Sequence, residues 1–440
     1  MVRLLSRNMK DSGIEWIGEV PEDWKLYRPY RVCKVIRGNC SFQKSDLSAE
    51  GDFVALQYGK TYKVDEVNNE YNFYVGESFF KEDQVVSNGD TILISTSETL
   101  EDLGHSCYYN REDVGLLGGE QMCLKPNNQF LRNKFLYYTT TFFNVELNQF
   151  ATGLKVYRFK ANDLKKINLI VPPIAEQFKI SNFLDKKVAE IDHILEKTRE
   201  SIEEYKKYKQ SIITEAITKG LNPDVKMKDS GIEWIGEIPE HWKISKIKNL
   251  YEIVLGKMLC NERLSDDYTL ENYLRAQNIK WDGINRENIK KMWFSKKEKE
   301  QYLLEKGDVV ITEGGSVGVS AVYNGEESPC YIQNAVHRAR GKSDNINKFL
   351  YYWMTLVVSG GYMDLICNKA TIAHYTKEKL ENTPISFCPV PEQISIIEYL
   401  DGKIKDFDNI IRQKEKLLID LEAYKKSLIY ECVTGKREVI

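Results

Sequence analysis

The chain contains a long internal repeat. Residues 9–24, MKDSGIEWIGEVPEDW, return almost unchanged as residues 227–242, MKDSGIEWIGEIPEHW. Because the two copies are 218 residues apart in a chain of 440, this is a domain-sized duplication, much longer than the roughly 20–50 residues of a solenoid unit. A chain with two similar modules can present two surfaces related by a pseudo-two-fold axis, which suits a two-fold partner such as double-helical DNA. Two copies without a shared task are the alternative.

The duplication extends beyond this opening block. The hexapeptide NKFLYY occurs at 133–138 and again at 347–352, and a Gly-Asp pair before an apolar run occurs at 89–90 and at 307–308. Between these blocks the two halves share little sequence. A common scaffold with divergent loops is typical of a recognition module, because loops carry specificity on a rigid frame.

A third pair of repeated segments is predicted to be helical. These segments, 174–219 and 392–436, each follow prolines, which are tolerated at helix starts. In both, apolar residues recur at alternating steps of three and four, the heptad pattern of a coiled coil. Gly220 and Gly435 follow the last apolar positions, as helix C-termini prefer. The predicted seam consists of Leu184, Val188, Ile191, Leu195, Ile202, Tyr205, Leu400, Ile404, Phe407, Ile411, Leu418 and Leu421.

Each of these helices is too apolar along one stripe to be stable alone in water, so we expect the two to pair. A pseudo-two-fold axis requires them to run antiparallel. About 35 residues span roughly 50 Å, so the pair would hold two modules at a fixed distance. That scale is compatible with half-sites about 34–36 Å apart on B-DNA. A helix bundle that only mediates dimerisation is the alternative.

The predicted fold class is α+β, with two homologous α/β modules separated by two long helices that form an antiparallel, pseudo-two-fold symmetric coiled coil. Strands are expected at 92–94 and 309–311, and helices at 135–143 and 349–358. The expected domains are a first module at 1–170, a first helix at 171–220, a second module at 221–386 and a second helix at 387–440.

Composition restricts the class of protein. Apolar residues make up 42% and charged residues 29% of the chain, as in globular proteins. We find no secretory signal and no apolar run of about 18 residues, so we expect a cytoplasmic protein without a membrane partner. The nine cysteines are scattered and none forms a C-x-x-C pair. We therefore expect reduced thiols, without disulfides or structural zinc.

The charge is unevenly distributed. The net charge of −3 does not by itself indicate nucleic-acid binding. Basic residues nevertheless cluster, with aromatics among or near them, at 25–44, 155–166 and 290–299. Such stretches favour contact with phosphates. A solvated surface is the alternative for each cluster.

The repeated blocks closely resemble the specificity subunit of type I restriction–modification systems. The resemblance is carried by the two WIGE-containing blocks, the Gly-Asp turns, NKFLYY, PPIAEQ at 172–177, PVPEQ at 389–393 and the matching helix tails. It covers essentially the whole chain. In that family each module is a target recognition domain that recognises half of a split DNA sequence, and the helices form a spacer on which two methyltransferase subunits dock.

The resemblance implies a chain without catalysis or cofactors of its own. S-adenosylmethionine would belong to the partner methyltransferase subunits, which methylate adenine, and ATP and Mg to the partner restriction subunits. The implied partners are double-stranded DNA with a bipartite target, two methyltransferase subunits and restriction subunits. The sequence agrees, since it lacks a G-x-x-x-x-G-K-[ST] loop, an Asn/Asp-Pro-Pro loop and paired histidines. Glycine-rich residues 313–318 are better explained as a tight turn than as a phosphate cradle.

Base recognition requires loop side chains that form hydrogen bonds with base edges. The loops that follow Ala-Thr at 151–152 and at 370–371 differ in length, so the two modules should recognise different sequences. Solvated loop residues and core aromatics are the alternative roles for every candidate. Candidate contact residues are Tyr58, Lys60, Ser95, Ser97, Lys155, Tyr157 and Arg158 in the first module, and Gln277, Lys280, Trp281, Ser316, His374 and Tyr375 in the second.

Four repeated tryptophans, Trp16, Trp24, Trp234 and Trp242, have another expected role. Identical residues cannot distinguish two different half-sites, so we expect them to pack the modules against the helices. Two other functions remain open: a stand-alone DNA methyltransferase or nuclease, against which the missing motifs argue, and a coiled-coil scaffold that does not bind DNA.

Overall fold

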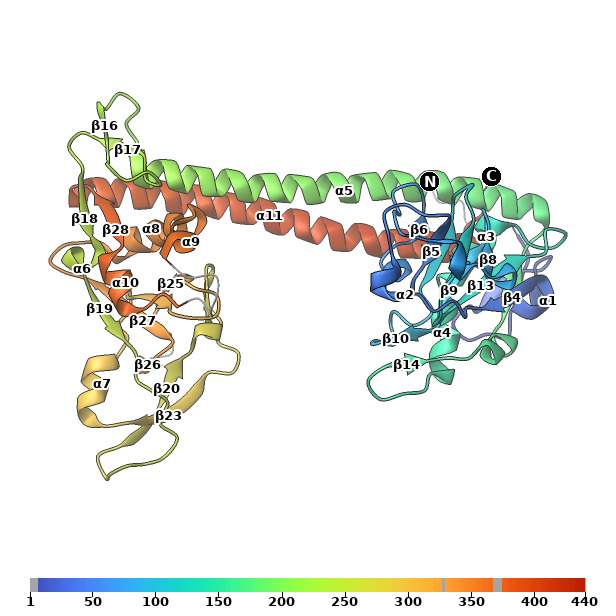
Figure 1. Ribbon diagram of the computed structural model, residues 1–440, viewed down its shortest axis with the longest axis horizontal. Helices are drawn as coiled ribbons and strands as arrows, with labels where there is room; N and C mark the ends of the chain where they lie inside the picture. Colours follow the sequence, from blue (N-terminus) through green and yellow to red (C-terminus); the bar gives the residue numbers. More distant parts are fainter. Residues whose placement is uncertain (1–6, 327–328, 367–373, 440) are drawn as a thin grey trace. The chain divides into compact units, whose positions relative to one another are not determined.

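The computed structural model describes residues 7–326, 329–366 and 374–439. It divides into two compact units: unit 1 comprises residues 1–197 and 417–440, and unit 2 comprises residues 198–416. Each unit contains one globular module and parts of both long helices, α5 (Ile174–Lys219) and α11 (Val390–Val433) (Figure 1). Of the helices in the described ranges, none has an apolar stretch long enough to cross a membrane.

The module of unit 1 is built on two β-sheets. Its strands are β1 (Met9–Asp11), β2 (Glu19–Pro21), β3 (Lys25–Tyr27), β4 (Cys33–Arg37), β5 (Phe53–Leu56), β6 (Glu66–Val67), β7 (Tyr74–Val75), β8 (Val85–Val86), β9 (Thr91–Ile94), β10 (Thr96–Ser97), β11 (Ser106–Tyr109), β12 (Gly115–Leu117), β13 (Gln121–Pro126), β14 (Tyr157–Arg158) and β15 (Leu169–Val171). The larger sheet has the order β4-β13-β9-β11-β6, and the smaller has the order β7-β5-β12-β8. Central strand β9 is buried throughout, which explains its uniformly apolar run and confirms the strand predicted there.

The module of unit 2 repeats this topology. Its strands are β16 (Met227–Asp229), β17 (Glu237–Pro239), β18 (Lys243–Lys246), β19 (Tyr251–Leu255), β20 (Thr269–Leu274), β21 (Ile279–Lys280), β22 (Gly283–Ile284), β23 (Lys290–Phe294), β24 (Val309–Thr312), β25 (Ser320–Val322), β26 (Cys330–Ile332), β27 (Val336–Gly341) and β28 (Pro384–Phe387). The order β19-β27-β24-β25 matches β4-β13-β9-β11 strand for strand, and a second sheet has the order β23-β20-β26. The strand predicted at 309–311 lies within β24.

Short helices complete the modules. They are α1 (Pro29–Val32), α2 (Tyr58–Thr61), α3 (Asn133–Thr140), α4 (Phe143–Leu147), α6 (Ile247–Leu250), α7 (Lys296–Tyr302), α8 (Asn347–Ser359), α9 (Tyr362–Ile366) and α10 (Lys377–Asn382). The helix predicted at 349–358 lies within α8. The helix predicted at 135–143 is interrupted, since α3 ends at Thr140 and α4 begins at Phe143. At this break the Thr140 and Thr141 hydroxyls donate to backbone carbonyls three residues back.

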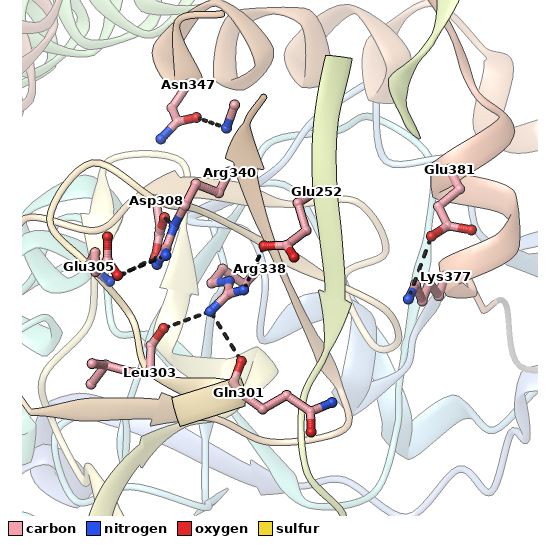
Figure 2. A network of polar contacts seen from close by, with 11 residues as sticks. Glu252, Gln301, Leu303, Glu305, Asp308, Arg338, Arg340, Asn347, Lys377 and Glu381 are labelled. Carbon is pink, nitrogen blue, oxygen red and sulfur yellow. Dashed lines mark hydrogen bonds and ion pairs between the residues drawn. The ribbon is translucent and has the colours of Figure 1, made fainter. Parts of the chain in front are cut away.

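The repeated Gly-Asp pair forms the same turn in both modules. Asp90 accepts a hydrogen bond from the backbone of Ser87 at 2.8 Å, and Asp308 accepts one from Glu305 at 2.7 Å. Asp308 also receives two 2.7 Å bonds from Arg340 of β27, which Figure 2 shows beside the Arg338–Glu252 pair. In unit 1, Lys125 of β13 pairs with Asp90. The motif is therefore repeated because it anchors the start of a central strand.

Two other repeated motifs attach each module to its long helix. The buried amide of Gln177 donates to Phe130 and Pro172 carbonyls and accepts from the Arg132 backbone, at 2.8–2.9 Å. Gln393 makes equivalent contacts in unit 2. In NKFLYY, the last tyrosine donates to an aspartate of the helix, Tyr138 to Asp185 at 2.7 Å and Tyr352 to Asp401.

The four repeated tryptophans attach the modules to the long helices only in part. The indole N–H of Trp24 donates to Glu176 at 3.0 Å, and that of Trp242 donates to Glu392 at 3.1 Å, so both attach a module to a long helix as predicted. Trp16 meets α11 through its carbonyl, which accepts from Tyr430 at 2.8 Å. Trp234 differs, because its ring lies against Trp353 and Tyr362 of the module.

The long helices pack antiparallel. In unit 2, Lys209 of α5 pairs with Asp408 of α11 at 2.5 Å, while the Lys414 ammonium lies 5.7 Å from the ring of Tyr205. The α11 partner number rises as the α5 number falls, which defines antiparallel packing. In unit 1, Asp192 of α5 pairs with Lys425 at 2.7 Å. All twelve predicted seam residues are buried or half-buried.

Truncating a seam side chain should destabilise unit 2. Leu400 has no exposed surface and belongs to the core shared by the module and both helices. We expect Leu400→Ala to lower the free energy of unfolding by about 2–5 kcal/mol, the usual cost of an unfilled leucine cavity. Urea denaturation followed by circular dichroism measures this change. Ile419→Ala, at an exposed α11 position, is the control and should change the free energy of unfolding by less than about 0.5 kcal/mol. Equal urea midpoints for the two variants would contradict the burial of Leu400 in this core.

Candidate functional site

Two basic segments of the first module fold onto one surface. Arg37 at the end of β4, Arg158 of β14 and Lys160 line a cavity of about 400 Å³. Lys155 is exposed on the loop that precedes β14. Within the described residues, Arg37, Lys155 and Lys160 have no acidic partner within ion-pair distance. We call Arg37, Lys155, Arg158 and Lys160 the cationic face.

The same two segments also meet at a second place. The guanidinium of Arg28 donates to the carbonyl of Ile167 at 3.0 Å, and the ammonium of Lys165 lies 5.1 Å from the ring centre of Tyr30. Basic clusters that are more than a hundred positions apart in sequence are therefore neighbours in space, a proximity that the sequence did not reveal.

A small strand pair positions the centre of the cationic face. Strand β14 pairs with β10, and Thr96 lies opposite Arg158 while Ser97 lies opposite Tyr157. Residues 152–158 form a hairpin, because Thr152 and Arg158 exchange two backbone hydrogen bonds of 2.9 Å. In Figure 1, β10 and β14 lie on the side of unit 1 away from the long helices. The structure thus brings together the predicted Ser95–Ser97 and Lys155–Arg158 segments.

A carboxylate lies among these cations. Glu120 lines the same cavity, accepts a hydrogen bond from the Thr96 hydroxyl and lies 3.5 Å from Arg158. Its backbone is in the left-handed region at φ 63°, which is uncommon for a residue other than glycine and often marks functional sites. A carboxylate can accept a hydrogen bond from the amino group of cytosine. Sequence inspection missed Glu120, whose only local signal is the preceding Gly118-Gly119 turn.

The other predicted residues of the first module differ in accessibility. Tyr58 is half-buried near the cavity; burial, and then the nearby charges of Glu98 and Glu120, raise its pKa. The Lys60 ammonium lies 4.2 Å from the ring of Phe73. Ser95 and Ser97 are buried, and the Ser97 hydroxyl accepts from a backbone N–H two residues later at 3.1 Å. Ser97 therefore forms a turn, and we leave its side chain out of the proposed contact surface.

The second module has the same backbone frame. In unit 1, Phe159 N–H donates to Ser95 at 3.2 Å and Ser95 N–H donates to Glu120 at 3.1 Å. In unit 2, Tyr375 N–H donates to Glu313 at 2.7 Å and Glu313 N–H donates to Ala335 at 2.9 Å. Tyr375 is thus equivalent to the buried Phe159.

This equivalence changes the role of one candidate. The side chain of Tyr375 has no exposed surface and its hydroxyl meets the Thr383 hydroxyl, so it belongs to the core. We do not carry Tyr375 into the contact surface. His374, which precedes it, is exposed and equivalent to Arg158. The His374 ring faces Gly314, since a Cβ at Gly314 would lie 3.4 Å from it.

The remaining candidates of the second module lie on two loops. Ser316 is exposed in the β24–β25 turn, where Gly315 and Gly318 have positive φ angles of 76° and 77°, so the predicted tight turn is confirmed. Glu313 begins this turn, and burial raises its pKa. Gln277 and Lys280 are exposed around β21.

Trp281 occupies a different setting. It is half-buried, its carbonyl accepts from Tyr351 at 2.6 Å, and it lines a cavity of about 530 Å³ whose other residues include Arg412 of α11. All of these residues belong to unit 2. Trp281 therefore lies at the junction of the module with the helices.

The two modules and their connecting helices match a known family. The family model described as the type I restriction modification DNA specificity domain matches residues 21–204 and again residues 239–423. The chain belongs to this family and carries two copies of its recognition domain, as the duplication predicted.

Proteins that are similar over most of the length of this chain support the same family assignment. The MjaVIII specificity subunit of Methanocaldococcus jannaschii is 24% identical over 433 residues, covering 96% of this chain and 94% of the relative. The EcoKI specificity subunit of Escherichia coli is 19% identical over 430 residues, covering 95% and 90%. A chain from a solved type I R-M system has a TM-score of 0.71 at 17% identity, covering 94% of this chain and 98% of its own. The HsdS subunit of Thermoanaerobacter tengcongensis has a TM-score of 0.50 at 16% identity, with the same coverage. At these identities the structural matches establish the fold.

Proposed function

We propose that this chain recognises a bipartite DNA target and has no catalytic activity of its own. Each module would contact one half-site of the duplex. The supporting observation is the shared backbone frame with different side chains at equivalent positions, where Arg158 corresponds to His374 and Glu120 to Ala335. A frame that holds side chains with different hydrogen-bonding groups, or with none, in equivalent places is what recognition of two different half-sites requires.

In this proposal phosphates and bases are contacted by different residues. The exposed lysines and arginine without acidic partners, Arg37, Lys155 and Lys160, suit phosphate oxygens. Arg158 supplies a donor and Glu120 an acceptor of the kinds that recognise base edges, and Tyr58 is close enough to feel the charges of both. In the second module Gln277, Lys280, Ser316 and His374 are the exposed counterparts. Lys60, Tyr157 and Trp281 are half-buried and remain secondary candidates for DNA contact.

The long helices would dock two methyltransferase subunits. In unit 1, Phe178 of α5 is an exposed apolar side chain outside the buried seam, and it marks what we call docking surface 1. At an offset of 216 it corresponds to Ile394 of α11, an exposed apolar side chain of unit 2 that marks docking surface 2. Two exposed apolar residues at equivalent positions suit two copies of one partner, because accessible apolar residues are typical of interfaces.

The cofactors would then be held by the partners. S-adenosylmethionine would bind to the methyltransferase subunits, and ATP with Mg to the restriction subunits, while this chain supplies DNA recognition and assembly. The relatives named as specificity subunits of type I restriction enzymes support this division of labour.

Two measurements test the proposal. Selection of bound duplexes from a random pool by the complex with its cognate methyltransferase subunits should yield two different conserved blocks separated by an unconserved spacer. Incubation of the pure chain with DNA and labelled S-adenosylmethionine should transfer no methyl group. A pool without sequence preference would favour a scaffold role, and methyl transfer by the chain alone would favour a complete methyltransferase.

The cationic face predicts how the affinity for DNA should depend on salt concentration. Arg37→Ala with Lys160→Ala should weaken DNA binding on all sequences and reduce the slope of log affinity against log salt by about 1.8, since each phosphate contact releases about 0.9 counterions. Fluorescence anisotropy across a salt series measures the slope. Lys206→Ala is the control, because this α5 lysine is paired with Glu203 at 2.8 Å. An unchanged slope in the double variant would show that these cations do not contact phosphates.

A further inference from the structure

The tip of the 152–158 hairpin exposes a large apolar side chain. Leu154 is 97% exposed, more than any other large apolar residue in the described part of the chain, and Val156 beside it is 38% exposed. Leaving a leucine in water forgoes the stabilisation that its burial provides. An apolar residue at a protruding tip therefore indicates that something covers it in the working complex.

The tip is built to hold its shape. Gly153 has φ 123°, and a Cβ placed there would lie 2.0 Å from the carbonyl oxygen of Val156, so only glycine closes the turn. The base of the hairpin is fixed by the β10–β14 pairing and by Phe159, whose side chain is buried in the main core of unit 1. Leu154 therefore projects from a turn whose conformation is fixed by Gly153 and by the strand pairing at its base.

The charges around the tip select the class of partner. Lys155 follows Leu154 directly, and Arg158 with Lys160 and Arg37 lies at the base of the hairpin around one cavity. A protein surface that covers a leucine would be apolar or mixed, whereas Arg37, Lys155 and Lys160, which have no acidic partner within ion-pair distance among the described residues, suit a polyanion. Duplex DNA offers phosphates for the lysines and arginines, and apolar base faces for the leucine.

We propose that Leu154 acts as a wedge that inserts between adjacent base pairs of the half-site bound by the first module. Proteins that contact the minor groove use leucine and similar side chains in this way, unstacking a base step and bending the duplex. Recognition of that half-site would then depend partly on how easily one base step deforms. This inference rests on the proposed DNA recognition and adds a mechanism to it.

The test uses the complex with its methyltransferase subunits and the duplex selected from the random pool. 2-Aminopurine placed at successive steps of the first half-site should brighten at one step on binding of the wild-type complex. Leu154→Ala should abolish that signal, reduce bending measured by end-to-end energy transfer, and weaken binding roughly ten- to hundredfold, the range for losing a buried leucine side chain. Leu154→Met should retain all three properties.

Controls separate the wedge from other roles of the tip. Lys155→Ala should lower the salt slope but keep the 2-aminopurine signal. If no step brightens and replacing one thymine by uracil reproduces the loss, Leu154 contacts a thymine methyl group and the wedge is wrong. If Leu154→Ala blocks subunit assembly but leaves DNA binding intact, the tip contacts protein and the wedge is again wrong. A wild-type complex without sequence preference would instead refute the proposed function itself.

Discussion

Replacing Phe178 by Asp should remove one methyltransferase subunit from the assembled complex, and replacing Ile394 by Asp should remove the other. The two side chains are 61% and 43% exposed and occupy equivalent positions of α5 and α11, one in each docking surface. A buried carboxylate without a partner carries a desolvation cost of several kcal/mol, enough to eliminate binding at one site. Native mass spectrometry should give one bound subunit for each single variant and none for the double variant.

The chain offers a matched control for this experiment. Ile419 is 68% exposed on α11, but its equivalent at the same offset is Glu203, so it belongs to neither docking surface. Ile419→Asp should therefore retain two subunits. Unchanged thermal unfolding of each variant excludes loss of the fold. If the Phe178 and Ile394 variants also retain two subunits, the methyltransferase docks elsewhere and the assignment of these surfaces fails.

The features that the sequence predicted well are those with a periodic or repeated signal. The seam positions recur at heptad spacing over both long segments, and a stripe of that length has few alternatives to pairing. The strands at 92–94 and 309–311 are central in their sheets and buried on both faces, which produces a continuous apolar run. Repeated motifs such as NKFLYY were informative about family for a structural reason, since they attach each module to a helix.

The candidate site was harder to predict because it depends on non-local strand pairing. Arg37 joins Arg158 only through the order β4-β13-β9 and the register of β10 with β14, and no local pattern encodes that register. Tyr375 illustrates how the exposure of a side chain can change from one residue to the next. It lies one residue after the exposed His374 and is fully buried, because neighbouring residues of extended chain point to opposite sides. A candidate chosen by residue type alone cannot make this distinction.

A chain truncated after residue 221 should form a dimer that recognises an inverted repeat of the first half-site. Truncation removes the part of α11 that completes unit 1 and exposes the α5 seam. Every predicted seam residue of α5 has an apolar residue at the equivalent position of α11. Leu184, for example, corresponds to Leu400, and Tyr205 corresponds to Leu421. Two copies of α5 can therefore pair antiparallel as α5 and α11 do, and closed two-fold pairing satisfies both exposed stripes.

Light scattering should give twice the mass of the truncated chain, and selection from a random pool should yield the same half-site block in both orientations around a spacer. Ile202→Asp in the truncated chain is the matched variant, because Ile202 lies in the buried seam. It should give monomers with only weak, largely non-specific DNA binding, since one half-site provides about half of the contacts. A truncated monomer that selected the complete bipartite target of the full chain would contradict the assignment of one half-site to each module, and with it the recognition mechanism proposed for the intact protein.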